Sequence, residues 1–253
     1  MSKPSVKQYY EPAPDTDFEA FAAVVESRRS IRRFADEPIP DEVVHRCLDL
    51  ALLAPTSSNL QAWEFYRVVD PEKKKRLAEA CLSQPAATTA PELIVAVARL
   101  DTWEEHSDAI LEVLERSEWA WPKSMKLYYK VVTRVAYGLG RFGELSLFKR
   151  AAIPLTGLFR PIPRGPKSRA ELVTWAVKSS ALACENLILA FRAAGYDTCA
   201  MEGMDEARVT RIVGLGDNPD AIVTMVISAG KRVPGGVYGP RIRLPRERFI
   251  HEV

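Results

Sequence analysis

The stretch from Val173 to Ala194 constrains the fold most, because its pattern is that of one long helix that is apolar on almost every side. Its middle, SSALAC (179–184), consists of small residues that allow another backbone to approach closely. A helix that is apolar all round has to be buried on every side. We therefore expect this segment, which ends at Gly195, to lie at the centre of the structure.

Shorter apolar segments on both sides of this helix alternate between strand and helix patterns. The expected strands are 64–70, 92–98, 196–200 and 221–228, and the expected helices are one leading from Phe18 to Arg28, 41–54, 71–82 and 205–213. This alternation is typical of an α/β or α+β sandwich. The 253 residues, 47% of them hydrophobic, are enough for one full core. We expect a single domain over 1–253 with a proline-containing arm at 1–16.

Charge and cysteine usage exclude several classes of protein. The net charge of +2 creates no overall field for nucleic acid. The N-terminus lacks the apolar core of a signal peptide, and no apolar run reaches the roughly 18 residues of a membrane span. The four cysteines form no C-x-x-C pair, and Cys47 and Cys184 occupy apolar helical positions. The sequence therefore predicts a cytoplasmic protein with buried thiols and without a metal site.

Residues 103–170 differ from the rest of the chain and are interpreted as an insertion. From Lys123 to Arg169 there are eleven basic residues and one acid, a net charge of 11 − 1 = +10, after an acidic stretch that ends at Glu118. Three interpretations stay open: two helices that pair by opposite charge, a basic lid beside a pocket for an anionic cofactor, or a peripheral membrane contact through LSLFKRAAIPLTGLF (145–159).

The segment GLGRFG (138–143) matches the dinucleotide fingerprint G-x-G-x-x-G, but its context does not fit. A ribose-binding acid is expected about 20 residues further on. Here Glu144 follows the last glycine directly and the next acid is Glu171. We therefore reject a Rossmann site.

Two separated arginine pairs predict a pocket for one phosphate. In RRSIRRFADEPIP (28–40), Arg28, Ser30 and Arg32 alternate, so an extended backbone turns them to one side. Guanidinium forks match phosphate oxygens and a serine hydroxyl adds a donor. Near the C-terminus, RIRLP (241–245) supplies Arg241 and Arg243 with the same spacing.

A third cluster, APTSSNLQAWEF (54–65), follows the end of a helix and brings five short polar side chains together around a turn. Such a cluster suits a polyhydroxylated or heteroaromatic ligand. With AMEGMD (200–205), these motifs occur in an order in which the chain resembles the nitroreductase family of flavoproteins, from about residue 20 to the end. Only the arm and 103–170 fall outside the resemblance.

The resemblance implies an α+β sandwich around a mixed β-sheet flanked by helices, and an intertwined homodimer with FMN at the subunit interface. The apolar helix 173–194 would then form the dimer core. Arg28, Arg29 and Ser30 would hold the FMN phosphate and ribityl end, and Arg241 and Arg243 would complete that grip. The alternation of the segment makes Arg33 a surface residue.

The resemblance also assigns the flavin ring. Arg32 would lie near the N1/O2 edge, where a cation stabilises reduced flavin. Glu202 and Gly203 would place backbone amides near N5 and O4, and Gln84 would reach the pyrimidine edge. The partner subunit would contribute Pro55, Thr56, Ser57 and Asn59. Thr56 stands where many relatives carry serine.

The function implied is hydride transfer from NAD(P)H through FMN to an electron-poor acceptor such as a nitroaromatic or a quinone, in ping-pong order. The basic insertion would favour an anionic partner, either the extra phosphate of NADPH or an acidic substrate. Two alternatives stay open. One is an FMN enzyme that oxidises or dehalogenates a specific metabolite without nicotinamide, and the other is a flavin-less binding module that uses the basic insertion.

Overall fold

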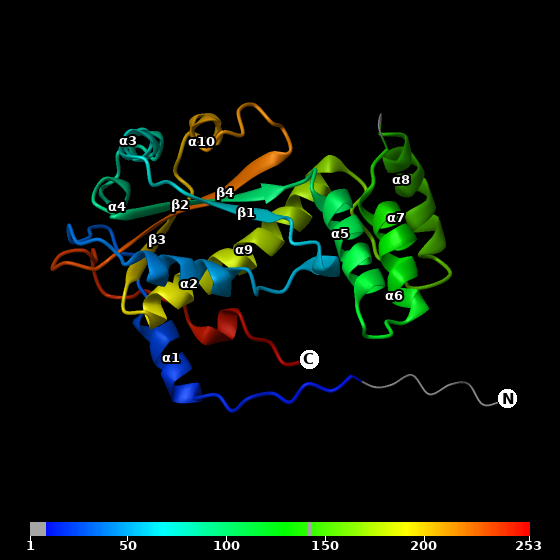
Figure 1. Ribbon diagram of the computed structural model, residues 1–253, viewed down its shortest axis with the longest axis horizontal. Helices are drawn as coiled ribbons and strands as arrows, with labels where there is room; N and C mark the ends of the chain where they lie inside the picture. Colours follow the sequence, from blue (N-terminus) through cyan, green and yellow to red (C-terminus); the bar gives the residue numbers. More distant parts are fainter. Residues whose placement is uncertain (1–8, 141–142) are drawn as a thin grey trace.

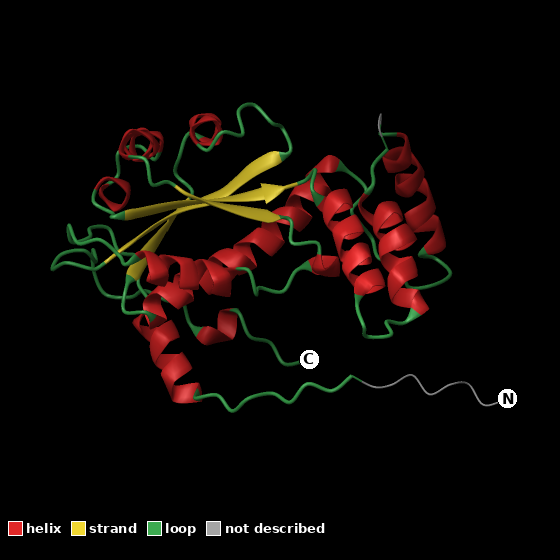
Figure 2. Cartoon of the chain, viewed as in Figure 1, coloured by secondary structure: helices red, strands yellow, loops and turns green. Residues whose placement is uncertain are grey.

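A four-stranded antiparallel sheet forms the middle layer of the computed structural model, which describes residues 9–140 and 143–253. The strand order is β1-β2-β4-β3 (Figure 2). The strands are β1 (Trp63–Arg67), β2 (Glu92–Arg99), β3 (Asp197–Met201) and β4 (Ala221–Gly230). β4 pairs with β2 on one side and with β3 on the other, so it is central, and all four strands match the expected segments within a few residues.

Helices cover both faces of this sheet (Figures 1 and 2). One face carries α3 (Pro71–Ala80), α4 (Pro85–Thr88) and α10 (Glu206–Ile212), and the other carries α2 (Asp41–Ala51) and α9 (Arg169–Ala193). β2 serves both cores by alternation: Leu93, Val95 and Val97 pack toward α3 and α10, whereas Ile94 and Ala96 pack toward α2 and α9. The expected α+β sandwich flanked by helices is therefore confirmed.

The sheet differs in one respect from the expected mixed sheet. Every pair of described strands is antiparallel, and the parallel component is a single bridge between Ser30 and Thr198 of β3. The segment after α1 (Phe18–Ser27) does not extend that bridge into a strand, because Ile31 N–H donates to Thr198 of β3 but the next N–H, of Arg32, donates to Gly236. The remaining short helical turns are η1 (Ser57–Asn59) and η3 (Arg246–Arg248).

α9 is the central helix of the fold, as expected. Ser180 is fully buried and accepts a hydrogen bond from the Thr224 hydroxyl of β4 at 2.9 Å, which the small residues of SSALAC permit. Burial is incomplete within one chain, because Leu182 is 49% exposed. The expectation that no segment reaches a membrane-spanning length needs correction: α9 is long and apolar enough, although it is a core helix with eleven buried residues.

The insertion folds into a helical bundle at one end of the sheet (Figure 1). Its elements are α5 (Trp103–Arg116), α6 (Lys123–Leu127), the π-helical turn η2 (Tyr128–Val132), α7 (Thr133–Tyr137) and α8 (Glu144–Thr156). Arg134 pairs with Asp108 and Glu104 of α5, so opposite charges do join helices here. The segment before GLGRFG is helical and not a strand, which agrees with rejecting a dinucleotide fold; residues 141–142 of that motif lie outside the described residues.

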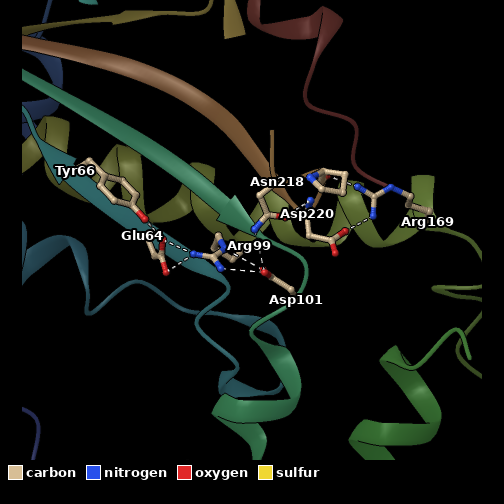
Figure 3. Close-up of polar contacts among 8 residues, drawn as sticks. Glu64, Tyr66, Arg99, Asp101, Arg169, Asn218 and Asp220 are labelled. Carbon is tan, nitrogen blue, oxygen red and sulfur yellow. Dashed lines mark hydrogen bonds and ion pairs between the residues drawn. The ribbon is translucent and has the colours of Figure 1, made fainter. Parts of the chain in front are cut away.

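Both ends of the insertion are tied to the same end of the sheet (Figure 3). Arg99, at the end of β2, donates to Glu64 of β1 at 2.7 Å and to both carboxylate oxygens of Asp101 at 2.9 Å. Asp101 also accepts from Asn218 before β4. At the other end of the insertion, Arg169 pairs with Asp220. This ion-pair network anchors the bundle to the core.

We predict a pH-dependent contribution from Asp101. The hydrogen bond from Arg99 lowers the pKa of this carboxyl below its ordinary value of 3.8. Asp101→Asn should lower the free energy of unfolding by about 1 kcal/mol near neutral pH, a value reduced by partial exposure. This difference in the free energy of unfolding should be complete above pH 3.8. It should shrink as the pH falls below 3.8 and vanish once the pH is below the lowered pKa of the folded protein.

Urea denaturation of both proteins at several pH values measures this difference. Asp36→Asn, at an exposed position, is the matched control and should leave stability within about 0.5 kcal/mol. A difference for Asp101→Asn that is the same above and below this pH window would contradict the assignment.

Candidate functional site

The segment after α1 is held in an extended form that sorts its residues onto two sides. Ile31 is fully buried and its backbone N–H donates to Thr198 of β3 at 3.0 Å. Phe34 is buried three residues later. Arg32 N–H donates to the carbonyl of Gly236 at 2.7 Å. Ser30 and Arg32, on either side of the buried Ile31, therefore face away from the core.

The outward side chains line a cavity of about 540 Å³. Its lining joins the start of the extended segment to the C-terminal tail, and includes Arg28, Arg29, Ser30, Arg32, Tyr238, Arg241 and Arg243. Five guanidinium groups line this cavity, and no carboxylate is among its lining residues. Such a donor set fits a phosphate or another multiply charged anion. Arg33 is exposed and does not line the cavity, as expected.

Contacts among these residues hold the tail against α1. The Arg241 guanidinium donates to the carbonyls of Glu26 and Arg28, each at 2.6 Å. Arg29 donates to the carbonyl of Gly239 at 2.5 Å. The structure therefore brings together the two arginine pairs that lie more than 200 residues apart.

Tyr238 was missed by the sequence argument. The guanidinium carbon of Arg32 lies 5.9 Å from the centre of its ring, within the range of a cation–π contact. A lone tyrosine in a tail carries no periodic signal, so no pattern could have indicated this contact.

A second group of expected residues meets at the end of β3. The Gln84 side-chain amide donates to the carbonyl of Gly203 at 3.3 Å and to that of Cys81 at 3.1 Å. Between them, Leu82 and Ser83 have φ values of 59° and 50°, in the region that side chains rarely adopt. Backbone strain of this kind is concentrated at binding sites. Glu202, next to Gly203, is exposed.

Pro55, Thr56, Ser57 and Asn59 do not line the arginine cavity of the same chain. Their turn lies against the inserted bundle instead. The hydroxyl of Tyr128 is 2.6 Å from the Ser58 hydroxyl, and that of Tyr137 is 2.7 Å from Ser58 and 3.0 Å from Ser57.

These tyrosines stabilise an unusual backbone. Ser58 and Asn59 have φ values of 57° and 53°, which cost energy for residues other than glycine. Tyr129 adds a hydrogen bond to the Ser58 carbonyl at 3.1 Å. The turn that presents the expected ligand-binding side chains is thus shaped by the insertion.

A further cavity of about 590 Å³ opens beside this turn. Ser57, Ser58, Tyr128, Tyr137 and Trp175 are among its lining residues. Tyr137 and Trp175 are also part of the core between the bundle and α9, with ring centres 4.4 Å apart. The aromatic residues of the insertion therefore serve both as its core and as a cavity wall.

The buried thiols are not candidates for nucleophilic catalysis. All four cysteines are buried and unpaired. Burial raises the pKa of Cys184 to about 12 and that of Cys47 to about 11, so both remain protonated at neutral pH. Their prediction as buried thiols is confirmed.

We predict that removing the Tyr137 hydroxyl, which belongs to the inserted bundle, destabilises the 57–59 turn. Tyr137→Phe deletes the group that contacts both Ser57 and Ser58, and should lower the free energy of unfolding by about 1–2 kcal/mol. Tyr10→Phe, at a position that is 83% exposed, should change it by less than about 0.5 kcal/mol. Urea denaturation compares the two variants, and equal effects would show that the hydroxyl pair contributes nothing.

Comparison with known proteins agrees with this geometry. The model of the Nitroreductase family matches residues 25–231. The chain is 28% identical over 223 residues to an NADH dehydrogenase of Thermus thermophilus. The aligned region covers 88% of this chain and 91% of that relative. The structure of the ydfN protein of Bacillus subtilis superposes with a TM-score of 0.73 at 22% identity, covering 94% of this chain and all of that one.

A further solved structure is the NADPH:FMN oxidoreductase of Vibrio harveyi complexed with NAD+, with a TM-score of 0.61 and 20% identity over 92% of this chain and 76% of that one. At these identities the structural matches establish the shared fold. Because the family model extends over most of the chain, the protein belongs to the nitroreductase family.

Proposed function

We propose that the protein is an FMN-dependent oxidoreductase that takes a hydride from NAD(P)H and reduces an electron-poor acceptor such as a nitroaromatic or a quinone. The observation that carries this proposal is the cavity lined by five arginines and no carboxylate. It suits the phosphate of FMN, which appears in the name of the Vibrio harveyi oxidoreductase. The NADH dehydrogenase relative supports nicotinamide as the donor.

Different residues of the cavity bind different parts of the cofactor. Arg28, Arg29 and Ser30 hold the phosphate and ribityl end, and Arg241 and Arg243 close over the phosphate from the C-terminal tail. Arg241 is already fixed by its bonds to the carbonyls of Glu26 and Arg28, so little side-chain freedom is lost when the anion binds.

Arg32 lies at the other end of this set, near the flavin N1/O2 edge. Its positive charge favours the reduced, anionic form of the ring and so raises the reduction potential. Tyr238 limits the positions open to the Arg32 guanidinium. The backbone amides of Glu202 and Gly203 would lie on the N5/O4 side, and Gln84, which donates to the carbonyl of Gly203, would reach the pyrimidine edge.

When bound, FMN would supply the hydride-transfer chemistry between the nicotinamide and the acceptor, in ping-pong order. The protein's part is to bind, orient and exclude water. No nucleophilic side chain is required, which agrees with the protonated, buried thiols.

The site is completed by a second copy of the chain. Pro55, Thr56, Ser57 and Asn59 of one subunit contact the flavin held by the arginines of the other. Large apolar side chains are exposed on α1, α9 and the C-terminal tail, which runs beneath α9 (Figure 1). They include Phe18, Phe21, Leu182, Phe249 and Ile250. A homodimer would bury them, and we place this dimer in the cytoplasm.

The first experiment is a visible spectrum of the purified protein with chromatography of the released cofactor. We expect about one FMN per chain, and NAD(P)H should bleach the flavin band in the absence of oxygen. Arg28→Gln should weaken FMN binding about tenfold or more, because a charge-assisted contact is lost. Arg33→Gln, on the opposite side of the same segment, should leave it unchanged.

Three outcomes would count against the proposal. A colourless protein that takes up no FMN would support a binding module. A flavoprotein that NAD(P)H does not reduce would support the nicotinamide-independent enzyme. Equal losses of affinity in Arg28→Gln and Arg33→Gln would show that the cavity does not hold the phosphate.

We predict that a charge on the exposed side of α9 separates the subunits. Leu182→Glu should convert the dimer to a monomer in light-scattering chromatography and release FMN, because it buries an unpaired carboxylate in the interface. Val69→Glu, at a position that is 65% exposed, should change neither. A dimer that persists with its FMN in Leu182→Glu would rule out this face.

A further inference from the structure

Helix α8 is folded with its apolar side outward. Leu147, Phe148, Leu155 and Leu158 lie at spacings that place them on one stripe, and each is between 61% and 77% exposed. The residue buried on the opposite side is Lys149, which is 6% exposed. In the usual amphipathic helix of a soluble domain these positions are reversed.

Hydrogen bonds on the inner side hold this orientation. The Lys149 ammonium donates to the carbonyls of Ala136 at 2.8 Å and Gly138 at 2.6 Å, where α7 ends. A cation is favoured at the C-terminus of a helix. On the same side, Ser146 N–H donates to the carbonyl of Leu139 at 3.1 Å. Rotating α8 to bury the stripe would break these hydrogen bonds and leave the Lys149 ammonium without its carbonyl partners, so the apolar side remains outward.

Cations border the stripe. Arg150 is exposed, and Gly157, seven residues later, lies on the same side of the helix. The Arg164 guanidinium packs directly on Gly157, so that a Cβ there would overlap it. Arg160 and Phe159, which is 84% exposed, continue the surface past the helix end. Other basic residues of the insertion, such as Arg134, Lys167 and Arg169, are paired with acids elsewhere, so the cations near this stripe are Arg150, Arg160 and Arg164.

An apolar stripe bordered by arginines matches the surface of a membrane with negatively charged lipids. Apolar side chains of such a helix enter the boundary between headgroups and acyl chains, and the bordering cations meet lipid phosphates. A protein partner would need an apolar groove rimmed by acids. The described exposed face is a single helix at the outer edge of the bundle, which a flat surface can reach (Figure 1).

We propose that the α8 face, defined as Leu147, Phe148, Arg150, Leu155, Leu158 and Phe159, binds peripherally to anionic lipid bilayers, with α8 lying in the plane of the membrane surface. This inference is independent of the proposed redox function, because none of these residues lines the arginine cavity.

The test is co-sedimentation of the full-length, FMN-loaded protein with vesicles of phosphatidylcholine, with and without about one third phosphatidylglycerol. Partitioning should be at least about tenfold stronger on the anionic vesicles. It should weaken when salt rises from about 0.1 M to about 1 M, as the screening length falls. The double variant F148S/L155S should no longer sediment with the anionic vesicles at either salt concentration. Arg150→Glu should bind them more weakly than the wild type.

Val69→Ser is the matched control, an equally exposed apolar residue outside the insertion, and should bind like the wild type. The visible spectrum of each variant verifies that the cofactor site is intact. Wild-type protein that stays in the supernatant would overturn the proposal, as would F148S/L155S that still sediments. A change of oligomeric state in F148S/L155S, with no vesicle binding by the wild type, would instead make the α8 face a contact between copies of the chain.

Discussion

The candidate site depends on the burial of Ile31 against β3. Five guanidinium groups around one cavity repel one another, so the fold has to hold them there at a cost. The bridge between Ser30 and Thr198 and the buried side chain of Ile31 supply that hold from the sheet, and Arg32 N–H is fixed to Gly236. An anion that binds in the cavity reduces the repulsion between these arginines. The free energy that the core spends on holding them together therefore contributes to the affinity for the anion.

α9 contacts the sheet, α2 and the inserted bundle. It packs under β4 through its small residues, shares a core with α2, and at its N-terminal end meets the inserted bundle through Trp175 and Tyr137. The same helix leaves Leu182 exposed, on the face where the proposed dimer would place a second copy. Arg169 at its start belongs to the ion-pair network of Figure 3, so the orientation of the bundle is tied to that of the sheet.

Periodic features of this chain could be predicted from the sequence, and contacts between distant residues could not. The strands follow from their short apolar runs, the outward side of 28–32 from the two-residue repeat of extended chain, and α9 from its composition. The hold of Tyr137 on Ser58 joins residues 79 positions apart and depends on a left-handed turn that serine does not signal. The orientation of α8 was open for the same reason: apolar content alone places Leu147 inside, and only the carbonyls at the end of α7 show why Lys149 is there instead.

The insertion therefore has two sides with different chemistry. Its inner side fixes the strained turn 57–59 through three tyrosines, and this turn completes the cofactor pocket of the partner subunit in the proposed dimer. Its outer side is apolar and cationic. One bundle carries both sides, and the ion-pair network at Asp101 and Arg169 ties it to the sheet.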